Sequence, residues 1–248
     1  MERQALAAFL DGLLESSRFE DYCPNGLQVE GKARIQRLVT GVTASLALVR
    51  AAVQARADAV LVHHGYFWRG EDPRLVGPRR ERIALLLEHG VSLFAYHLPL
   101  DAHPVLGNNA QLASVLGWRV DGQFGSYGLG CWHDLDEAVS PAALAARLRR
   151  RLGGRPLALG NPRERIARVG WCTGAAQDML EAAIAAGCDA FVSGEVSERT
   201  THMARESGVL YLAAGHHATE RFGVQALGER VAAEFGVEHR FIDDPNPV

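Results

Sequence analysis

The sequence predicts an α/β protein made of two similar lobes with mostly parallel or mixed sheets, related by a pseudo-twofold. Two observations lead to this fold class. Short apolar runs alternate with amphipathic stretches in the first half of the chain, which is the pattern of β-α-β units. The second half then repeats the first. We expect one lobe over residues 1–125 and the other over residues 126–248.

The first lobe begins with an amphipathic helix, because apolar residues recur at helical spacing over residues 3–15. A turn-rich loop follows at residues 21–26, where Pro24 and an Asn-Gly pair favour a turn. This loop fits either a tight connection or a contact with a substrate. Strands are predicted at residues 27–31, 35–42, 60–62 and 91–96, and helices at residues 45–55, 79–88 and 109–116. The glycine-rich segment 117–130 resembles a domain boundary.

The internal repeat is visible without any gap over eleven residues. Residues 51–61 align with residues 182–192 at an offset of 131, given by the aligned aspartates Asp58 and Asp189 (189 − 58). Downstream, residues 89–97 resemble residues 207–216, and each segment is an apolar strand that ends in histidine. Chance similarity among alanine-rich helices is the alternative, and the ordered series of matches disfavours it.

Composition excludes several classes of protein. Apolar residues make up 48 % and charged residues 22 % of the chain, as in ordinary globular proteins. The formal charge of −3 does not indicate a nucleic-acid-binding protein, because such proteins usually carry a basic surface. The four cysteines lack the CxxC spacing of a zinc ribbon and suggest no disulfide framework. No apolar run approaches the roughly 18 residues of a membrane span, and no signal-cleavage pattern is present, so we expect a cytoplasmic protein without a membrane partner.

His63 and His64 stand at the end of the predicted strand that begins at Ala59. Ligands bind at the carboxyl ends of strands in α/β sheets, so this pair is a candidate for metal binding. The pair alone equally fits structural histidines that cap a loop. The following loop, residues 66–78, contains two aromatic residues and is a candidate flap over the histidines.

Two further histidines precede a carboxylate by four residues. His97 precedes Asp101, and His216 precedes Glu220 at the matching place in the second lobe. A spacing of four puts two side chains on one face of a helix. Histidine and carboxylate without cysteine suit a divalent ion such as Zn, Mn, Fe, Ni or Mg, and a carboxylate can bridge two such ions. We therefore expect a metal cleft between the lobes.

Several segments give the chain a resemblance to a known family. It is similar to the dinuclear-metal proteins of the NIF-three-like family, often named type 2 homologues of GTP cyclohydrolase I, and above all to the bacterial YbgI branch. The matching segments are CPNGLQVEG (23–31), GVTAS (41–45), AVLVHHGYFW (59–68), YHLPLDAHP (96–104), LGNNAQLA (106–113), FVSGEVSERTTHMARE (191–206) and AAGHHATERFG (213–223).

The resemblance implies two divalent metal ions per chain, held by His63, His64, Asp101, His216 and Glu220. It implies that Glu220 bridges both ions, that His64 and Asp101 complete one, and that His63 and His216 complete the other. It further implies a homohexameric ring whose metal sites face a central cavity.

Other polar residues near these motifs are candidates for supporting or catalytic roles. Glu195 occupies the place equivalent to His64 and is a candidate general base. His97 and His202 are expected to orient ligands or move protons, and His217 is treated as a neighbour of His216. Glu195 and His97 are thus the catalytic candidates.

The functional hypothesis is a metal-dependent hydrolase acting on a small molecule. The family name suggests GTP, attacked at C8 so that the imidazole ring opens. The sequence has no GxxxxGK[ST] loop, so the metals or arginines such as Arg69, Arg74 and Arg199 would have to hold a triphosphate. The alternatives are a phosphoesterase or amidohydrolase of another substrate, and a non-enzymatic metal-binding or regulatory ring scaffold.

Overall fold

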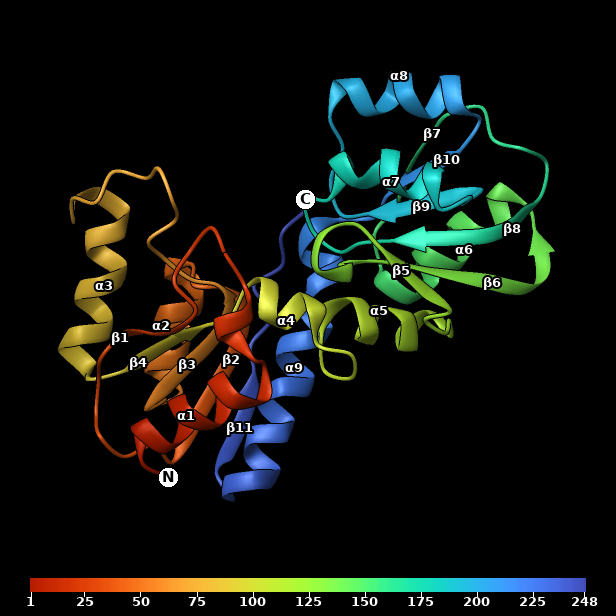
Figure 1. The fold of residues 1–248 in the computed structure, drawn as a ribbon. Coiled ribbons are helices and arrows are strands. Elements are labelled where there is room, and N and C mark those ends of the chain that lie inside the picture. Colours follow the sequence, from red (N-terminus) through yellow and green to blue (C-terminus); the bar gives the residue numbers. More distant parts are fainter. The chain divides into compact units, whose positions relative to one another are not determined.

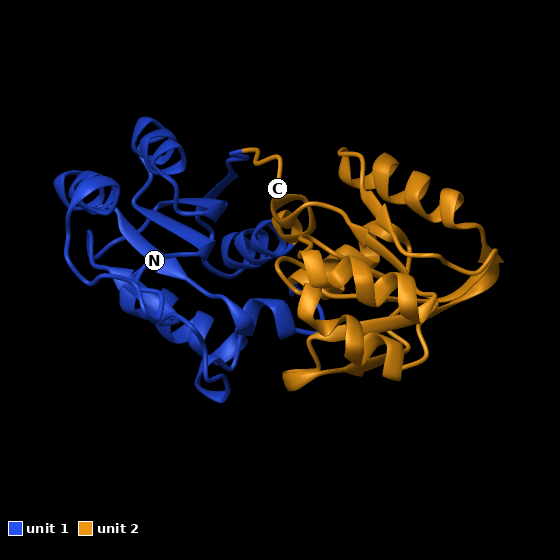
Figure 2. Ribbon diagram, turned by 90° about the horizontal axis from the view of Figure 1, so that it is seen from above, with its two compact units in different colours: residues 1–107, 223–244 blue, residues 108–222, 245–248 orange.

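A computed structural model describes residues 1–248, which fold into two units that are each built around one sheet (Figure 1). Unit 1 comprises Met1–Gly107 and Gly223–Asp244, and unit 2 comprises Asn108–Phe222 and Pro245–Val248 (Figure 2). The boundary between residues 222 and 223 falls within helix α9 (His216–Phe235).

The units differ from the expected lobes because of what their outlying segments pack against. Leu112 and Leu116, which precede residue 125, belong to the core of unit 2. Val224 and Leu227 on α9 belong to the core of unit 1. The boundary at residues 125 and 126 rests on the repeat and on the glycine-rich segment 117–130, and it stays a prediction.

Unit 1 contains a five-stranded mixed sheet. Its order is β1 (Gly26–Val29), β4 (Ser92–Ala95), β3 (Ala59–His64), β2 (Arg37–Thr43) and β11 (Glu238–Phe241). Strands β4, β3, β2 and β11 are parallel, and β1 pairs antiparallel with β4 at the edge.

Strand β3 is buried on both faces, which explains its unbroken apolar run. Alternate side chains of a strand point to opposite faces. Val60 and Val62 pack in the cluster that includes side chains of α2 (Leu46–Gln54) and α3 (Gly77–His89). Leu61 packs in the opposite cluster with side chains of α1 (Arg3–Leu13) and α9. The strand therefore sits at the centre of the unit.

Unit 2 contains a six-stranded mixed sheet. Its order is β5 (Gly122–Phe124), β6 (Gly130–Val139), β8 (Ile166–Trp171), β9 (Ala190–Ser193), β10 (Leu210–Ala213) and β7 (Leu157–Leu159). Strands β8, β9 and β10 are parallel, and the other three pair antiparallel.

Helices also pack on both faces of this second sheet. Side chains of α5 (Asn108–Leu116) and α6 (Pro141–Leu152) belong to one core cluster. Side chains of α7 (Leu180–Ala185) and α8 (Glu198–Ser207) belong to the other. The predicted fold class, two similar α/β lobes with mixed sheets, is confirmed by these two units.

Equivalent hydrogen bonds show how closely the two units repeat one another. Asp58 Oδ2 accepts the backbone N–H groups of residues 36 and 37 at 2.9 and 3.1 Å. Asp189 Oδ2 accepts those of residues 167 and 168, both at 2.9 Å. Each position in the second set is the first plus 131 (58 + 131 = 189), so the offset read from the sequence holds in the structure.

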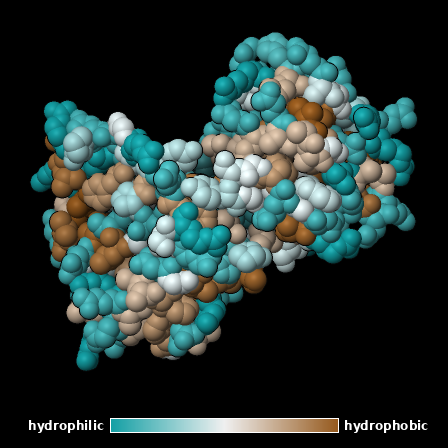
Figure 3. All heavy atoms as spheres, in the orientation of Figure 1, coloured by the Kyte–Doolittle hydropathy of each residue, from teal (hydrophilic) through white to brown (hydrophobic).

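Polar and apolar residues are interspersed on the surface shown in Figure 3. None of the helices combines the length and the apolar character that crossing a membrane would require.

Candidate metal centre

In unit 1, three histidines gather where strands β3 and β4 end. The ring centroids of His63 and His64 lie 4.5 Å apart, and those of His63 and His97 lie 5.0 Å apart. One ring nitrogen from each of the three lies within 4.8 Å of the others. Asp101 joins them, because its Oδ1 lies 3.5 Å from His63 Nε2. The structure therefore brings together all three ligands predicted in the first lobe, and His97 with them.

The short helix α4 (Leu98–Ala102) positions Asp101. His97 is its N-cap residue, and Pro99 stands in its first turn, where a missing N–H group costs nothing. The Asp101 N–H donates to the His97 carbonyl oxygen at 3.2 Å, so one helical turn places the aspartate next to the histidine. The Asp101 side chain is 11 % exposed, and His63 is fully buried.

Each of the paired histidines is held by a hydrogen bond at Nδ1. His63 Nδ1 lies 3.0 Å from the Tyr96 carbonyl oxygen, which can only accept, so Nδ1 carries the proton and donates. Its Nε2 is then the ring atom whose lone pair can bind a metal. His64 Nδ1 lies 2.9 Å from Thr43 Oγ1, and because a hydroxyl can accept, this contact is compatible with the tautomer whose Nε2 binds a metal.

His97 is held by the loop at residues 21–26. Its Nδ1 lies 2.7 Å from Asp21 Oδ1, and its backbone N–H donates to Asn25 Oδ1 at 2.7 Å. Burial alone would raise the pKa of Asp21, but the hydrogen bond and charge of His97, with donors from Asn25 and Leu98, lower it to about 2. The loop thus has a local role, which is to fix the ring of His97.

The predicted flap contacts the histidines through one side chain. The ring of Trp68 lies 6.0 Å from that of His64 and 4.9 Å from that of His97. Trp68 Nε1 donates to the Gly65 carbonyl at 3.3 Å, and the Arg69 guanidinium donates to the Asp21 carbonyl at 2.9 Å. The loop is therefore tied to both segments that carry the cluster.

Unit 2 supplies the other predicted ligands from the first turns of α9. His216 Nε2 lies 2.9 Å from Glu220 Oε2, and His216 Nδ1 lies 2.6 Å from Glu195 Oε1. Glu220 is 3 % exposed. Burial alone would lower the pKa of His216, but hydrogen bonds and charges of Glu220 and Glu195 raise it to about 9.

Two glycines that sequence reasoning missed make room for these side chains. A Cβ atom at Gly174 would lie 2.0 Å from Glu220 Oε1 and 3.2 Å from His216 Nε2. A Cβ atom at Gly194 would lie 2.6 Å from the Cα of His216. The backbone of both glycines therefore forms a cradle for His216 and Glu220. The repeat gave a signal at one of them, because Gly194 takes the place of His63 in the second lobe (194 − 63 = 131).

The donor set fits divalent metal ions. Three imidazoles that are each held at Nδ1 and two almost fully buried carboxylates match the ligands that Zn, Mn, Fe or Ni take in proteins. No cysteine belongs to the set. Cys23 lies near Asp21 and His97, but burial raises the pKa of its thiol to about 12, with a further contribution from Asp21.

The strand register corrects one equivalence drawn from the repeat. Ala59 of β3 pairs with Ser92, and Ala190 of β9 pairs with Leu210. Leu210 is therefore the equivalent of Ser92, which gives an offset of 118 between these two strands (210 − 92). With this offset, His216 is equivalent to residue 98 and not to His97 (216 − 118 = 98). The segment 207–216 contains one residue more than 89–97, so the two histidines match in sequence without matching in register.

Other sequence candidates have local partners. His202 pairs with Glu198 on the exposed face of α8 at 2.7 Å. Arg74 pairs with Asp72 at 2.5 Å, and Arg199 pairs with Asp178.

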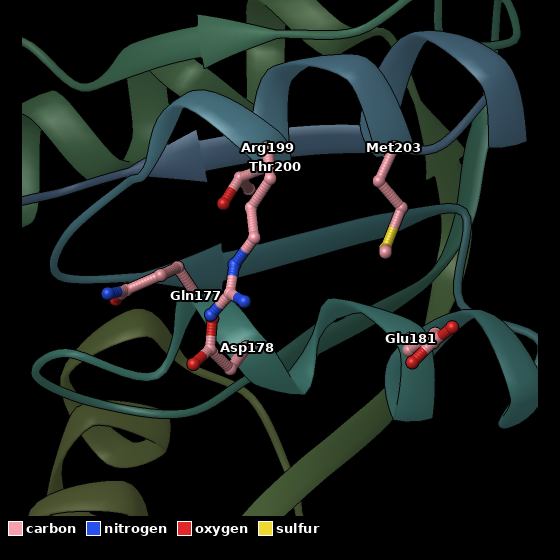
Figure 4. A pocket seen from close by; sticks show the side chains of 6 residues that line it. All are labelled: Gln177, Asp178, Glu181, Arg199, Thr200 and Met203. Carbon is pink, nitrogen blue, oxygen red and sulfur yellow. The ribbon is translucent and has the colours of Figure 1, made fainter.

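The Arg199–Asp178 pair lies in a hollow of about 200 Å³ in unit 2, shown in Figure 4. The lining residues are Gln177, Asp178, Glu181, Arg199, Thr200 and Met203. Neither predicted ligand of unit 2 is among them, so this hollow is separate from the metal-ligand residues.

Comparison with known proteins places the chain in a broad group of relatives. The family model Duf34/NIF3 (NGG1p interacting factor 3) matches residues 1–247. A Pseudomonas aeruginosa protein named "GTP cyclohydrolase 1 type 2 homolog" is 53 % identical over 96 % of this chain and 95 % of its own length. A protein of the same name from Escherichia coli (strain K12) is 49 % identical, with full coverage of both chains.

Solved structures resemble the chain equally well. The protein titled "protein ybgI, unknown function" has a TM-score of 0.97 and 49 % identity, and covers 100 % of both chains. TTHA1606 from Thermus thermophilus has a TM-score of 0.92 and 34 % identity, also with full coverage. HcgD from Methanocaldococcus jannaschii, at 19 % identity and a TM-score of 0.85 over 97 % of each chain, shares the fold.

Proposed function

The chain belongs to the Duf34/NIF3 family, and on that premise we propose that it binds two divalent metal ions through His63, His64, Asp101, His216 and Glu220. One observation carries the proposal: in all three histidines an oxygen atom holds Nδ1, which leaves Nε2 as the ligand atom. Histidines that bind metals in proteins are commonly oriented in this way.

The roles of the carboxylates follow from their surroundings. Glu220 is buried beside His216 and has two oxygens, so we propose it as the bridging ligand. The 3.5 Å distance between Asp101 and His63 favours a shared ion for these two residues. That grouping differs from the partition implied by the family resemblance, in which Asp101 accompanies His64.

The reaction class that this site suits best is hydrolysis. A divalent pair, when bound, supplies Lewis acidity that polarises the scissile bond and makes water more acidic. His97 is oriented by Asp21 through Nδ1, so its Nε2 is placed to accept a proton. Trp68 packs beside His64 and His97 and limits the access of bulk water to them.

We propose a small molecule as the substrate, with GTP as the first candidate because of the name that the relatives carry. Opening of the guanine ring would begin with attack of water on C8. The three arginines considered as triphosphate ligands already have partners in Asp21, Asp72 and Asp178, so they give GTP no added support. The homohexameric ring implied by the family resemblance remains part of the proposal.

An assay of the metal-loaded protein tests the hydrolase proposal. GTP, other nucleotides and generic phosphodiesters are incubated with wild type, His64→Ala and Glu220→Ala. We expect turnover in wild type and its loss in both variants, and a decrease of about 10²-fold or more in His97→Ala, the typical contribution of a positioned acid or base. His202→Ala is the control, because His202 is exposed and pairs with Glu198 on the surface of α8.

Metal-loaded wild type without turnover on any of these substrates would contradict the hydrolase proposal. The non-enzymatic metal-binding scaffold would then be the better account. Turnover on phosphodiesters but not on GTP would retain the hydrolase and replace its substrate.

A further inference from the structure

We infer that Glu195 is a positioning residue for His216 and that it makes one ion of the proposed pair bind more tightly than the other. The inference rests on the proposed function, since it concerns how the metal ligands differ from one another. Its structural basis lies entirely within unit 2.

The contact between the two side chains has a defined direction. Glu195 Oε1 lies 2.6 Å from His216 Nδ1, and a carboxylate can only accept, so Nδ1 donates. The bond fixes both the tautomer and the ring orientation of His216. The opposite ring atom, Nε2, then faces Glu220.

The backbone around Glu195 is held in place by several hydrogen bonds. The N–H groups of Gly194 and Glu195 both donate to the Gly174 carbonyl, at 2.8 and 3.2 Å. The Tyr211 hydroxyl donates to the Glu195 carbonyl at 2.5 Å. Because the main chain is anchored on both sides, the carboxylate reaches His216 from a fixed starting point.

The three proposed histidine ligands differ in the charge of the group that holds them. His63 donates to a backbone carbonyl, and His64 contacts the hydroxyl of Thr43. Both of these partners are neutral, whereas the partner of His216 is a carboxylate. Hydrogen bonds to an ionised partner are roughly twice as strong as neutral ones. A carboxylate behind a histidine also makes that histidine a better electron donor to a metal.

The internal repeat shows which residues of unit 1 correspond to Gly194 and Glu195. Glu195 is the equivalent of His64, since 64 + 131 = 195, and Gly194 is the equivalent of His63. The strand end that supplies two ligands in unit 1 therefore supplies none in unit 2. It provides instead a glycine that lies against the backbone of His216 and a carboxylate that holds its ring.

This role differs from that of a general base. Positioning uses Glu195 Oε1, which His216 engages, whereas a general base would have to reach the reacting water through the other carboxylate oxygen. We therefore assign proton transfer to His97 and metal affinity to Glu195.

A metal titration tests the inference without reference to activity. Metal-free protein is titrated with Co²⁺ against a chromophoric chelator, which resolves a tighter and a weaker binding step in wild type. Glu195→Gln keeps the size of the side chain and removes its charge. We expect it to weaken the tighter step by about 10–100-fold, the usual effect of losing such a partner, and to leave the weaker step unchanged.

Two further variants complete the design. Glu198→Gln is the matched control, because Glu198 forms an exposed pair with His202 at 2.7 Å in the same unit, and both of its steps should equal those of wild type. Glu195→Asp keeps the negative charge on a shorter side chain. We expect the affinity of its tighter binding step to lie between the affinities of that step in wild type and in Glu195→Gln. It also supplies the readout if Glu195→Gln does not fold.

Binding in Glu195→Gln that matches wild type at both steps would overturn the inference, and so would equal weakening in Glu198→Gln. If Glu195→Gln does not fold, wild-type affinity at both steps in Glu195→Asp would overturn it. Two indistinguishable steps in wild type would also contradict it. Wild type that binds no Co²⁺ would instead contradict the proposed function, so the two failures are distinguishable.

Discussion

At the scale of single residues, the ligands of unit 2 depend on a position without a side chain. Gly174 has a φ of +68°, and a Cβ atom there would lie 2.0 Å from Glu220 Oε1. The carboxylate would have to leave its place beside His216. The glycine therefore serves both the backbone conformation and the proposed bridging ligand.

Gly174→Ala should consequently reduce metal binding as well as stability. The positive φ should cost about 1–2 kcal/mol in the free energy of unfolding, and displacement of Glu220 should lower the number of bound metal ions. Both quantities are measured on the same preparation, by urea denaturation of the metal-free protein and by elemental analysis of the loaded protein.

Gly187→Ala separates the two effects. Gly187 has a similar φ of +75°, but its added Cβ would meet only the Arg168 guanidinium at 3.6 Å. This variant should lose similar stability and keep its metal. Equal metal loss in both variants, or none in Gly174→Ala, would contradict the cradle.

The residue types at the site could be predicted from the sequence, but the hydrogen-bond partners that orient these side chains could not. The adjacency of His63 and His64 and the spacing of His216 and Glu220 are visible in one dimension. The group that holds each Nδ1 is not: Tyr96 follows His63 by 33 positions, and Thr43 precedes His64 by 21. Such contacts depend on strand register, which the sequence does not state.

At the scale of elements, the sheet of each unit contains one aspartate that accepts backbone hydrogen bonds from the start of a neighbouring strand. Asp58 and Asp189 each accept two backbone N–H groups at the start of β2 and β8. Burial alone would raise the pKa of Asp58, but these donors and Lys32 lower it below its ordinary 3.8. Asp58 therefore adds stability above pH 3.8, which is lost as pH falls through the lower pKa of the folded state.

Asp58→Ala and Asp189→Ala should destabilise the protein to a similar extent. Each leaves two backbone donors without their acceptor, at a cost of about 1–3 kcal/mol in the free energy of unfolding. Urea denaturation at neutral pH measures this. The difference between wild type and Asp58→Ala should shrink in acid, once the wild-type carboxyl is protonated.

Asp72→Ala is the control, because Asp72 lies in an exposed loop and pairs with Arg74. A change within about 0.5 kcal/mol is expected there. A large effect of Asp58→Ala with none of Asp189→Ala would show that the two hydrogen-bond patterns are not equivalent in energy.

Most elements could be placed from the sequence because buried parallel strands are continuous apolar runs. The helix expected at residues 45–55 is α2 at Leu46–Gln54, and the strand expected at residues 91–96 is β4 at Ser92–Ala95. The segment 117–130 is rich in glycine, and part of it is regular structure. It contains β5, where a Cβ on Gly122 would lie 2.4 Å from the Trp132 ring, so that glycine permits close strand packing.

At the scale of the whole molecule, the two units repeat one sheet plan but not one set of ligands. Unit 1 carries the predicted ligands His63, His64 and Asp101, and unit 2 carries the predicted ligands His216 and Glu220. Two protein ligands alone are too few for a metal pair, so the proposed centre requires residues from both halves of the sequence. This explains why neither half of the repeat predicts the site when it is considered alone.

The metal content of the purified protein decides whether the proposed pair of ions is present. The protein is purified without chelators and without a metal-affinity column, and its metal-to-chain ratio is measured by mass spectrometry of the elements. We expect about two divalent ions per chain, as in other two-metal sites, and a clearly lower ratio in Glu220→Ala. A ratio near zero in wild type that does not rise after incubation with Zn²⁺, Mn²⁺, Fe²⁺ or Ni²⁺ would contradict it.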